Sequence, residues 1–479
     1  MGNFGALEIG KRALIAQRFG MDVTSNNIAN VNTPGYARQR VEFGETDPQL
    51  LPGGKGYIGS GVEVANVRLF REEYFDREIR NNLSKKSGFE NDSSILSRVE
   101  TILKEPSDDG IDTTIDKFFN SFQELANQPE SIARREFALN QAQSLVDEFN
   151  GMSARFTELR SQVSEKITTS TDEVNRIIER ITELNNKLTP LVSLGSDAGA
   201  TIINERARAV EQLSALVGPV NATVDTKGLM SVSVNGASII STVIGHKVQV
   251  SETTSSSGER TLSMQVISRA SGDVISKFNP GAGEIASNLK HYNVTLDGND
   301  SSGGFSIVKS LDELAGAIVN KVNTVAQTGY GLDDVTAPNR NIFDPTGTTA
   351  ASIKLDPAVL NQPRNLPISI EAGTPGDNTI ARQIAALADD PTFINAQTAQ
   401  QFYANTLNRV ATAGADAANG AKTTSLVNDQ LNAQRESVIG VNLDEEALSL
   451  IRYQRAFEAA ARIVNTTNEL LGTLINLGR

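Results

Sequence analysis

The chain has 479 residues and a formal net charge of −13, from 44 Lys and Arg against 57 Asp and Glu. An acidic surface repels nucleic-acid phosphates and anionic lipid headgroups, so neither is an expected partner. With no Cys and two His, the chain has no disulfide, no thiolate nucleophile, no Cys-based zinc site and no His-rich metal cluster.

The length favours about three domains. No stretch approaches the roughly 20 consecutive apolar residues of a membrane span. The first 20 residues are amphipathic and lack a continuous apolar region followed by a cleavage site. We therefore expect that the chain, if it leaves the cell, does so without a cleaved signal peptide. The absence of Cys suits export as an unfolded chain, because no crosslink can form on the way.

Residues 4–30 are predicted to form a helix, because apolar side chains recur every seven residues and form one stripe along it. The stripe consists of Leu7, Leu14, Met21 and Ile28. The helix is expected to end before Pro34, since the residue that precedes a proline avoids the helical region. Pro34 and Gly35 fit a type II turn. Residues 37–70 then alternate as extended strands do.

Residues 72–217 are predicted to be helical. The clearest segment is 160–190, where apolar residues follow the 4-and-3 spacing of a coiled coil. Pro190 and Gly195 are expected to end this helix. We interpret its apolar stripe as internal core.

Residues 219–280 are rich in Val, Ser, Thr and Gly, with turn pairs at Lys227–Gly228 and Asn235–Gly236. They predict a small β domain inserted into a helical body. Helix returns near 308–327, and helices resume between 380 and 436.

The final helix is predicted from 443 to 476. Its apolar stripe consists of Leu443, Leu450, Phe457, Val464 and Leu471. Asn442 is the predicted N-cap, and Glu445 stands three residues later as in a capping box. We expect this stripe to face the N-terminal stripe, or copies of it in neighbouring molecules. Both sets of residues therefore form the predicted assembly interface.

The two stripes alone are not expected to order the terminal helices. Burying nine large apolar side chains contributes roughly 10–25 kcal/mol in total. Ordering about 65 terminal residues costs ~1–2 kcal/mol for each residue in backbone entropy. We therefore expect the terminal helices to be mobile in the free monomer and to become ordered only on assembly, when neighbouring copies cover their remaining faces.

No residue pattern in the sequence indicates catalysis. The Gly-rich segment 53–61 lacks the spacing of a phosphate-binding loop. His246 and His291 are interpreted as surface or strand residues. We expect no catalytic residue, no cofactor and no metal site.

These segments predict a mainly α fold with paired N- and C-terminal coiled-coil helices, a helical-bundle middle domain and an inserted small β domain. The predicted domains are 1–70 (N-terminal helix and extended arm, paired with 437–479), 71–218 (helical domain, first part), 219–284 (inserted β domain), 285–436 (helical domain, second part, with an irregular insert at 331–379) and 437–479 (C-terminal axial helix).

Residues 25–36 read SNNIANVNTPGY. This segment resembles the N-terminal signature of the axial proteins of the bacterial flagellum, the rod, hook and hook-associated family. The turn of that motif comprises Asn32, Thr33, Pro34, Gly35 and Tyr36. Residues 441–479, which begin VNLDEEALSLIRYQRAF, resemble the terminal helix of the same family. A long helical segment before the β region is similar to the hook-associated members at the hook–filament junction.

The resemblance implies a secreted structural protein of the extracellular flagellum. In that family the paired terminal helices form an inner tube, and the β domain faces outward. The implied partners are copies of the chain, the hook protein, the third hook-associated protein and a cytosolic export chaperone at the C-terminal helix. Export as an unfolded chain through the flagellar type III system is also implied.

Three alternatives remain open from the residues. The chain could be another rod or hook axial protein, such as the hook protein. An adhesin-like β module on a coiled-coil stalk predicts ordered ends in a monomer and a ligand pocket in the β region. A hydrolase or lyase on a helical scaffold needs clustered acids or a nucleophile within 219–280 or 331–379.

Overall fold

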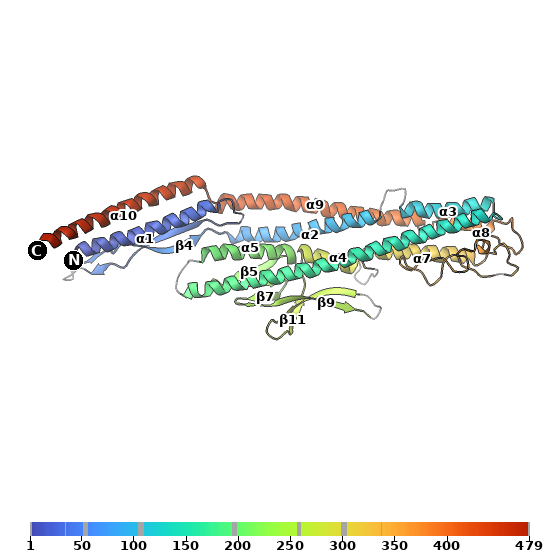
Figure 1. The fold of residues 1–479 in the computed structure, drawn as a ribbon, viewed down its shortest axis with the longest axis horizontal. Helices are drawn as coiled ribbons and strands as arrows, with labels where there is room; N and C mark the ends of the chain where they lie inside the picture. Colours follow the sequence, from blue (N-terminus) through green and yellow to red (C-terminus); the bar gives the residue numbers. More distant parts are fainter. Residues whose placement is uncertain are drawn as a thin grey trace.

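The computed structural model describes residues 2–33, 35–50, 56–103, 110–193, 199–255, 260–297, 304–336 and 338–477. The molecule is elongated, and Figure 1 shows the two terminal helices lying side by side at one end. The body helices continue along the long axis from there, and the strands around β7, β9 and β11 project from one side of the body, while β4 lies beside α1.

The terminal part contains two helices and two antiparallel β ladders. Its elements are α1 (Gly2–Ala29), β1 (Gln39–Glu45), β2 (Gln49–Leu50), β3 (Tyr57–Ile58), β4 (Val62–Leu69) and α10 (Leu443–Leu477). In the longer ladder Val41 pairs with Val67, and one irregularity follows Glu42. The α1 helix packs along α10 and also contacts β1 and β4.

The body is built mainly from long helices. They are α2 (Glu73–Leu103), α3 (Ile111–Asn127), α4 (Ile132–Ser193), α5 (Ala200–Val217), α7 (Ile307–Ala326) and α9 (Ala399–Ile439). The shorter elements are α6 (Gly283–Lys290), the π-helical turn η1 (His291–Thr295), η2 (Pro363–Asn365), α8 (Thr379–Ala386) and η3 (Leu387–Asp389). At 62 residues, α4 is about 93 Å long.

The structure extends two predicted helices. The segment 160–190 is part of α4, which begins at Ile132 and passes Pro190 to end at Ser193. The helix therefore ends between Pro190 and Gly195, where an end was expected, and the proline inside its last turn costs one backbone hydrogen bond. The break before the last helix lies at residues 440–442, since α9 continues to Ile439.

The strands of the insert form two sheets. They are β5 (Val220–Val224), β6 (Met230–Val234), β7 (Ala237–Ser241) and β8 (Ile244–Gly245) in one, and β9 (Lys247–Thr254), β10 (Arg260–Ile267) and β11 (Val274–Phe278) in the other. The predicted turn at Asn235–Gly236 is present, with φ of 46° and 84°. This pair of positive values is the requirement of a type I′ hairpin.

The sheets share their core with the helices. Val232, Ile240 and Val266 pack in one buried cluster with Ile178 and Ile181 of α4 and with side chains of α5. Each sheet therefore uses the helical body as its second layer. The mainly α fold with an inserted β region is confirmed.

The main core of the body is centred on aromatic side chains of α3. Phe118 is fully buried, and its ring centroid lies 5.0 Å from that of Phe119, 5.2 Å from that of Phe122 and 5.7 Å from that of Phe343. Phe343 comes from the loop after α7, so this cluster joins segments that are more than 200 residues apart in the sequence.

We predict that Phe118→Ala lowers the free energy of unfolding of the body by about 3–5 kcal/mol, because it removes a buried ring and leaves a cavity. Phe137→Ala is the matched control, since Phe137 is 41% exposed, and its effect stays within about 0.5 kcal/mol. Urea denaturation followed by circular dichroism measures both. Equal losses from the two variants would contradict the assignment of this core.

Candidate functional site

The two terminal helices approach each other through small residues. A Cβ at Gly10 would lie 2.7 Å from Val464 Cγ2, and one at Gly20 would lie 3.1 Å from the Tyr453 ring. The order of these contacts shows that α1 and α10 run antiparallel. Glycine is required at Gly10 because any side chain there would push the helices apart.

The buried row of α10 lies beside the predicted stripe. Its most buried positions recur every seven residues, at Glu446, Ala460 and Thr467, which are 3%, 4% and 6% exposed. Tyr453, half-buried, completes this row. This row, together with Gly10 and Gly20 of α1, forms the contact line between the two helices, which we call the seam, and the glycines make room there for larger side chains of α10.

The predicted stripe residues flank this seam. Half-buried positions are Leu7, Leu14, Met21, Ile28, Leu450, Phe457, Val464 and Leu471. Leu443 is 50% exposed at the first turn of α10. Contact between the two stripes is therefore partial, and one side of each helix is left uncovered.

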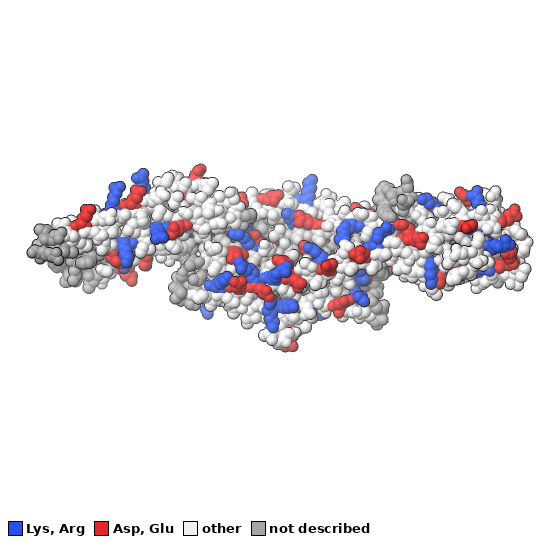
Figure 2. Space-filling view, in the orientation of Figure 1, with Lys and Arg blue, Asp and Glu red and all other residues white. Residues whose placement is uncertain are grey.

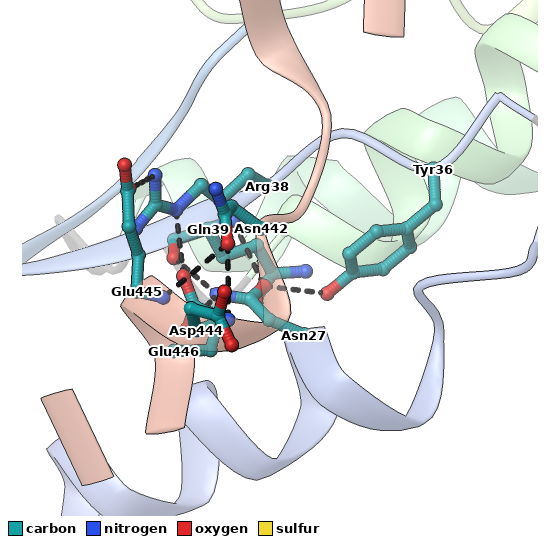
Figure 3. Close-up of polar contacts among 8 residues, drawn as sticks. All are labelled: Asn27, Tyr36, Arg38, Gln39, Asn442, Asp444, Glu445 and Glu446. Atoms are coloured by element: carbon teal, nitrogen blue, oxygen red, sulfur yellow. Dashed lines mark hydrogen bonds and ion pairs between the residues drawn. The ribbon is translucent and has the colours of Figure 1, made fainter. Parts of the chain in front are cut away.

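The root of the helix pair is a polar cluster around Asn27, which is 1% exposed. Figure 3 shows it between α1, β1 and the start of α10. Asn27 Nδ2 donates to the Gln39 carbonyl at 2.8 Å and to Glu446 Oε2 at 3.0 Å. Asn27 Oδ1 accepts from the Gln39 amide and from the Tyr36 hydroxyl, both at 3.0 Å. One amide side chain thus joins three segments of the chain.

A buried ion pair completes the root. Arg38 Nε lies 2.6 Å from Glu446 Oε1, and Arg38 Nη1 donates to Glu445 Oε2 at 2.7 Å. The Glu446 side chain is 3% exposed and that of Glu445 is 59% exposed. Glu446 needs the guanidinium and the Asn27 amide because an unpaired buried carboxylate is costly. These contacts fix the start of α10 on β1.

The predicted cap and turn lie in the same region. Asn442 Oδ1 accepts from the Asp444 amide at 3.0 Å, while the Glu445 carboxylate faces Arg38. The Tyr36 amide donates to the Thr33 carbonyl at 3.1 Å, and Gly35 has φ of 71°.

Pro34 lies outside the described residues, and Asn32 is exposed. Burial, followed by the negative charge of Glu446, raises the pKa of Tyr36 to about 12.

A second cluster of polar side chains lies where the root meets the helical body. Arg435 Nη1 is 2.9 Å from Glu211 Oε1, and Arg71 Nε is 2.7 Å from Asp76 Oδ2. Asn204 Nδ2 donates to the Ala37 carbonyl at 3.4 Å. The segment between Tyr36 and Arg38 is therefore held from both sides. Sequence reasoning did not single out Asn27, Arg38 or Glu446, although Asn27 belongs to the SNNIANVNTPGY motif.

Both terminal helices carry exposed apolar side chains among charged ones such as Arg18 and Arg452. On α10, Leu448, Ile451, Ile463 and Leu470 are 65%, 53%, 50% and 54% exposed. On α1, Ile15 and Phe19 are 60% and 39% exposed. Exposed apolar side chains that continue along a helix are a feature of protein–protein contact surfaces.

The described residues show no arrangement for catalysis or metal binding. Among them no group of three or more His, Asp or Glu could hold a metal ion. His291 is 1% exposed, so its interpretation as a surface or strand residue was wrong. The π-helical turn places its Nε2 2.9 Å from Asp92 Oδ1 and its Nδ1 3.1 Å from Thr295 Oγ1.

Figure 2 shows Lys and Arg interspersed with Asp and Glu over the visible face. None of the helices, over the part of the chain that is described, is long and apolar enough to span a bilayer.

Family models match both terminal regions. Residues 7–36 match the model of the flagella basal body rod protein, and residues 437–477 match that of the flagellar basal body rod FlgEFG protein C-terminal region. Together with the paired helices, these matches place the chain in the class of flagellar axial proteins. The model of the flagellar hook-associated protein FlgK helical domain matches residues 96–343, more than half of the chain. The chain belongs to the family of flagellar hook-associated protein FlgK, a structural component of the flagellum and not an enzyme.

Full-length relatives agree with the family. The chain is 26% identical to flagellar hook-associated protein 1 of Bacillus subtilis (strain 168), over 99% of this chain and 98% of the relative. It is 24% identical to the protein of the same name from Escherichia coli (strain K12), over 97% and 98%. The solved flagellar hook junction protein FlgK from Burkholderia pseudomallei is similar with a TM-score of 0.47 and 19% identity, over 56% of this chain and 46% of that one. The resemblance seen in the sequence is confirmed.

We predict that Glu446→Gln destabilises the root by about 1.5–3 kcal/mol, because the buried Arg38 contact loses its charge. Glu445→Gln is the matched control, and its exposed pair is worth less than about 1 kcal/mol. Hydrogen exchange of the Gln39 amide, which donates to Asn27, measures the local opening free energy. If the two variants had equal effects, the buried pair would not hold the root.

We predict an alkaline loss of stability that depends on Tyr36. Its pKa is about 12 in the folded protein against an ordinary value of 10.0. The stability contributed by the neutral phenol is complete below pH 10 and is lost as the pH rises through 12. Tyr36→Phe removes this loss, and Tyr57→Phe, at an exposed tyrosine, leaves it in place. Urea titrations between pH 9 and pH 12 test this. A slope that survives in Tyr36→Phe would assign the loss to another group.

Proposed function

We propose that this chain is a junction protein that links the flagellar hook to the filament and assembles through its terminal helices. The observation that carries the proposal is the set of large apolar side chains that α1 and α10 leave at least 39% exposed. They are Ile15, Phe19, Leu448, Ile451, Ile463 and Leu470.

The energetics favour packing between copies. Full burial of one large apolar side chain contributes about 1.5–3 kcal/mol, so six such residues supply a strong driving force when neighbours cover them. Glycines at the seam let the two helices approach closely. The large apolar side chains on the other faces of the helices are not buried by this contact and remain available to neighbouring copies. A ring or tube of such pairs is the arrangement that leaves no copy uncovered.

The proposed partners follow from position and family. The hook protein and the third hook-associated protein would contact opposite sides of an assembled ring. A cytosolic export chaperone would cover the exposed apolar side chains of α10 before export. Passage through the type III system as an unfolded chain is compatible with a body that has no Cys and whose described core is held by packing.

The test uses the exposed apolar side chains of α10, where Leu448→Asp and Ile451→Asp place a charge at positions that are 65% and 53% exposed. These variants are chosen over Phe457→Asp, because Phe457 is half-buried beside α1 and its loss would also disturb the intramolecular pair. In a strain that lacks this protein, we expect the native chain to restore attached filaments.

The two variants are expected to leave hooks bare and to release filament subunits into the medium, with attached filaments reduced at least ~10-fold. Val335→Asp is the control, at a side chain that is 85% exposed in the body. Normal filaments with both α10 variants would refute assembly through these side chains.

A further inference from the structure

A polar cleft of about 280 Å³ opens beside the root, between β1 and the first turns of α10. The Arg38–Glu446 pair lies in its wall, and Figure 3 shows how Glu445 and Glu446 meet Arg38 there. Arg40 from β1 and Arg452 from α10 also line it. The cleft is thus enclosed by three arginines and two glutamates.

The charge in this cleft is not balanced within the chain. Both glutamates contact Arg38. Neither Arg40 nor Arg452 has a carboxylate within 4 Å among the residues that the structure describes, and both are exposed. Gln39, another lining residue, is 6% exposed and its Nε2 has no acceptor there. In a chain of net charge −13, this cleft therefore has more cationic groups than acidic ones. Guanidinium groups without an ion pair suit the binding of a carboxylate.

Apolar side chains border the cleft. Leu448, which lines it, is 65% exposed, and Ile451 is 53% exposed one turn further. A partner that matches both the unpaired arginines and the apolar border of the cleft has an acidic side chain next to large apolar ones. Such an occupant is most simply a helix face.

The outward face of α1 has this composition. Ile15, Phe19 and Asp22 recur at spacings of four and three residues, so they share one face. Asp22 is exposed and has no ion-pair partner in the described part of the chain. Gly10, Gly20 and Asn27 face α10 or the root, so this acid points away from the α10 of its own molecule.

We propose that the cleft receives Asp22 of a second copy of the chain. Ile15 and Phe19 of that copy pack on Leu448 and Ile451, and the carboxylate binds between Arg40 and Arg452. This inference rests on the proposed assembly and deepens it by naming the contact between neighbours. Two different surfaces meet, so the contact is heterologous and extends from copy to copy until it closes a ring or forms a helix.

The first experiment is a charge swap in the full-length chain, with binding to hooks isolated from a strain that lacks this protein. Arg452→Asp and Asp22→Arg are each expected to raise the concentration for half-maximal binding at least ~10-fold. The variant with both substitutions restores the pair between copies and recovers most of the loss. Arg382→Asp, at an exposed arginine of α8, is the matched control for net charge and leaves binding unchanged.

A crosslink gives a direct readout, because the chain has no Cys of its own. Chains with Asp22→Cys are mixed with chains carrying Arg452→Cys, bound to hooks and oxidised. A disulfide-linked dimer is expected on the hooks, and none in dilute solution.

The results separate the proposed Asp22 contact from the proposed junction function. The Asp22 contact is overturned if the native chain binds hooks but the double variant binds as weakly as the single variants. It is also overturned if the native chain binds hooks but no crosslink forms. Both results leave the junction function intact. Native chain that fails to bind hooks overturns both.

Discussion

The arrangement of this protein depends on the buried contact of Arg38 and Glu446 with Asn27. A carboxylate that is 3% exposed is tolerated because a guanidinium at 2.6 Å and an amide at 3.0 Å replace its water. The contact sets the relative position of α1, β1 and α10 where they meet the body. The start of α10 is therefore placed by polar groups, beside apolar contacts such as that of Phe43 with Tyr453, whose ring centroids are 5.9 Å apart.

The terminal helices meet where glycines of α1 face larger side chains of α10. Gly10 lies against Val464 and Gly20 against Tyr453, while Ile15, Phe19 and Leu448 are exposed. Large apolar side chains that the intramolecular contact leaves exposed are available for contact with other molecules.

The sequence predicts the helices more fully than the contacts between them. Seven-residue spacing identifies α1 and α10, and composition identifies the strands after residue 219. The buried row of Glu446, Tyr453 and Ala460 has the same seven-residue spacing as the predicted stripe. A choice by hydrophobicity alone picks the larger residues of the stripe and misses the buried row. Asn27 and Glu446 are 419 positions apart, so no local pattern connects them. The burial of His291 depends on a π-helical turn, for which no signal was read in the sequence.

The way the two parts of the molecule are connected has a mechanical consequence. The chain crosses between them twice, from β4 into α2 at residues 70–72 and from α9 into α10 at residues 440–442. Two connections, with Arg38 bound to Glu446 on one side and Arg435 bound to Glu211 on the other, restrict rotation about the long axis more than a single connection would. The orientation of the helix pair relative to the body is therefore set at α2 and α9 together, because both helices begin or end where the two parts meet.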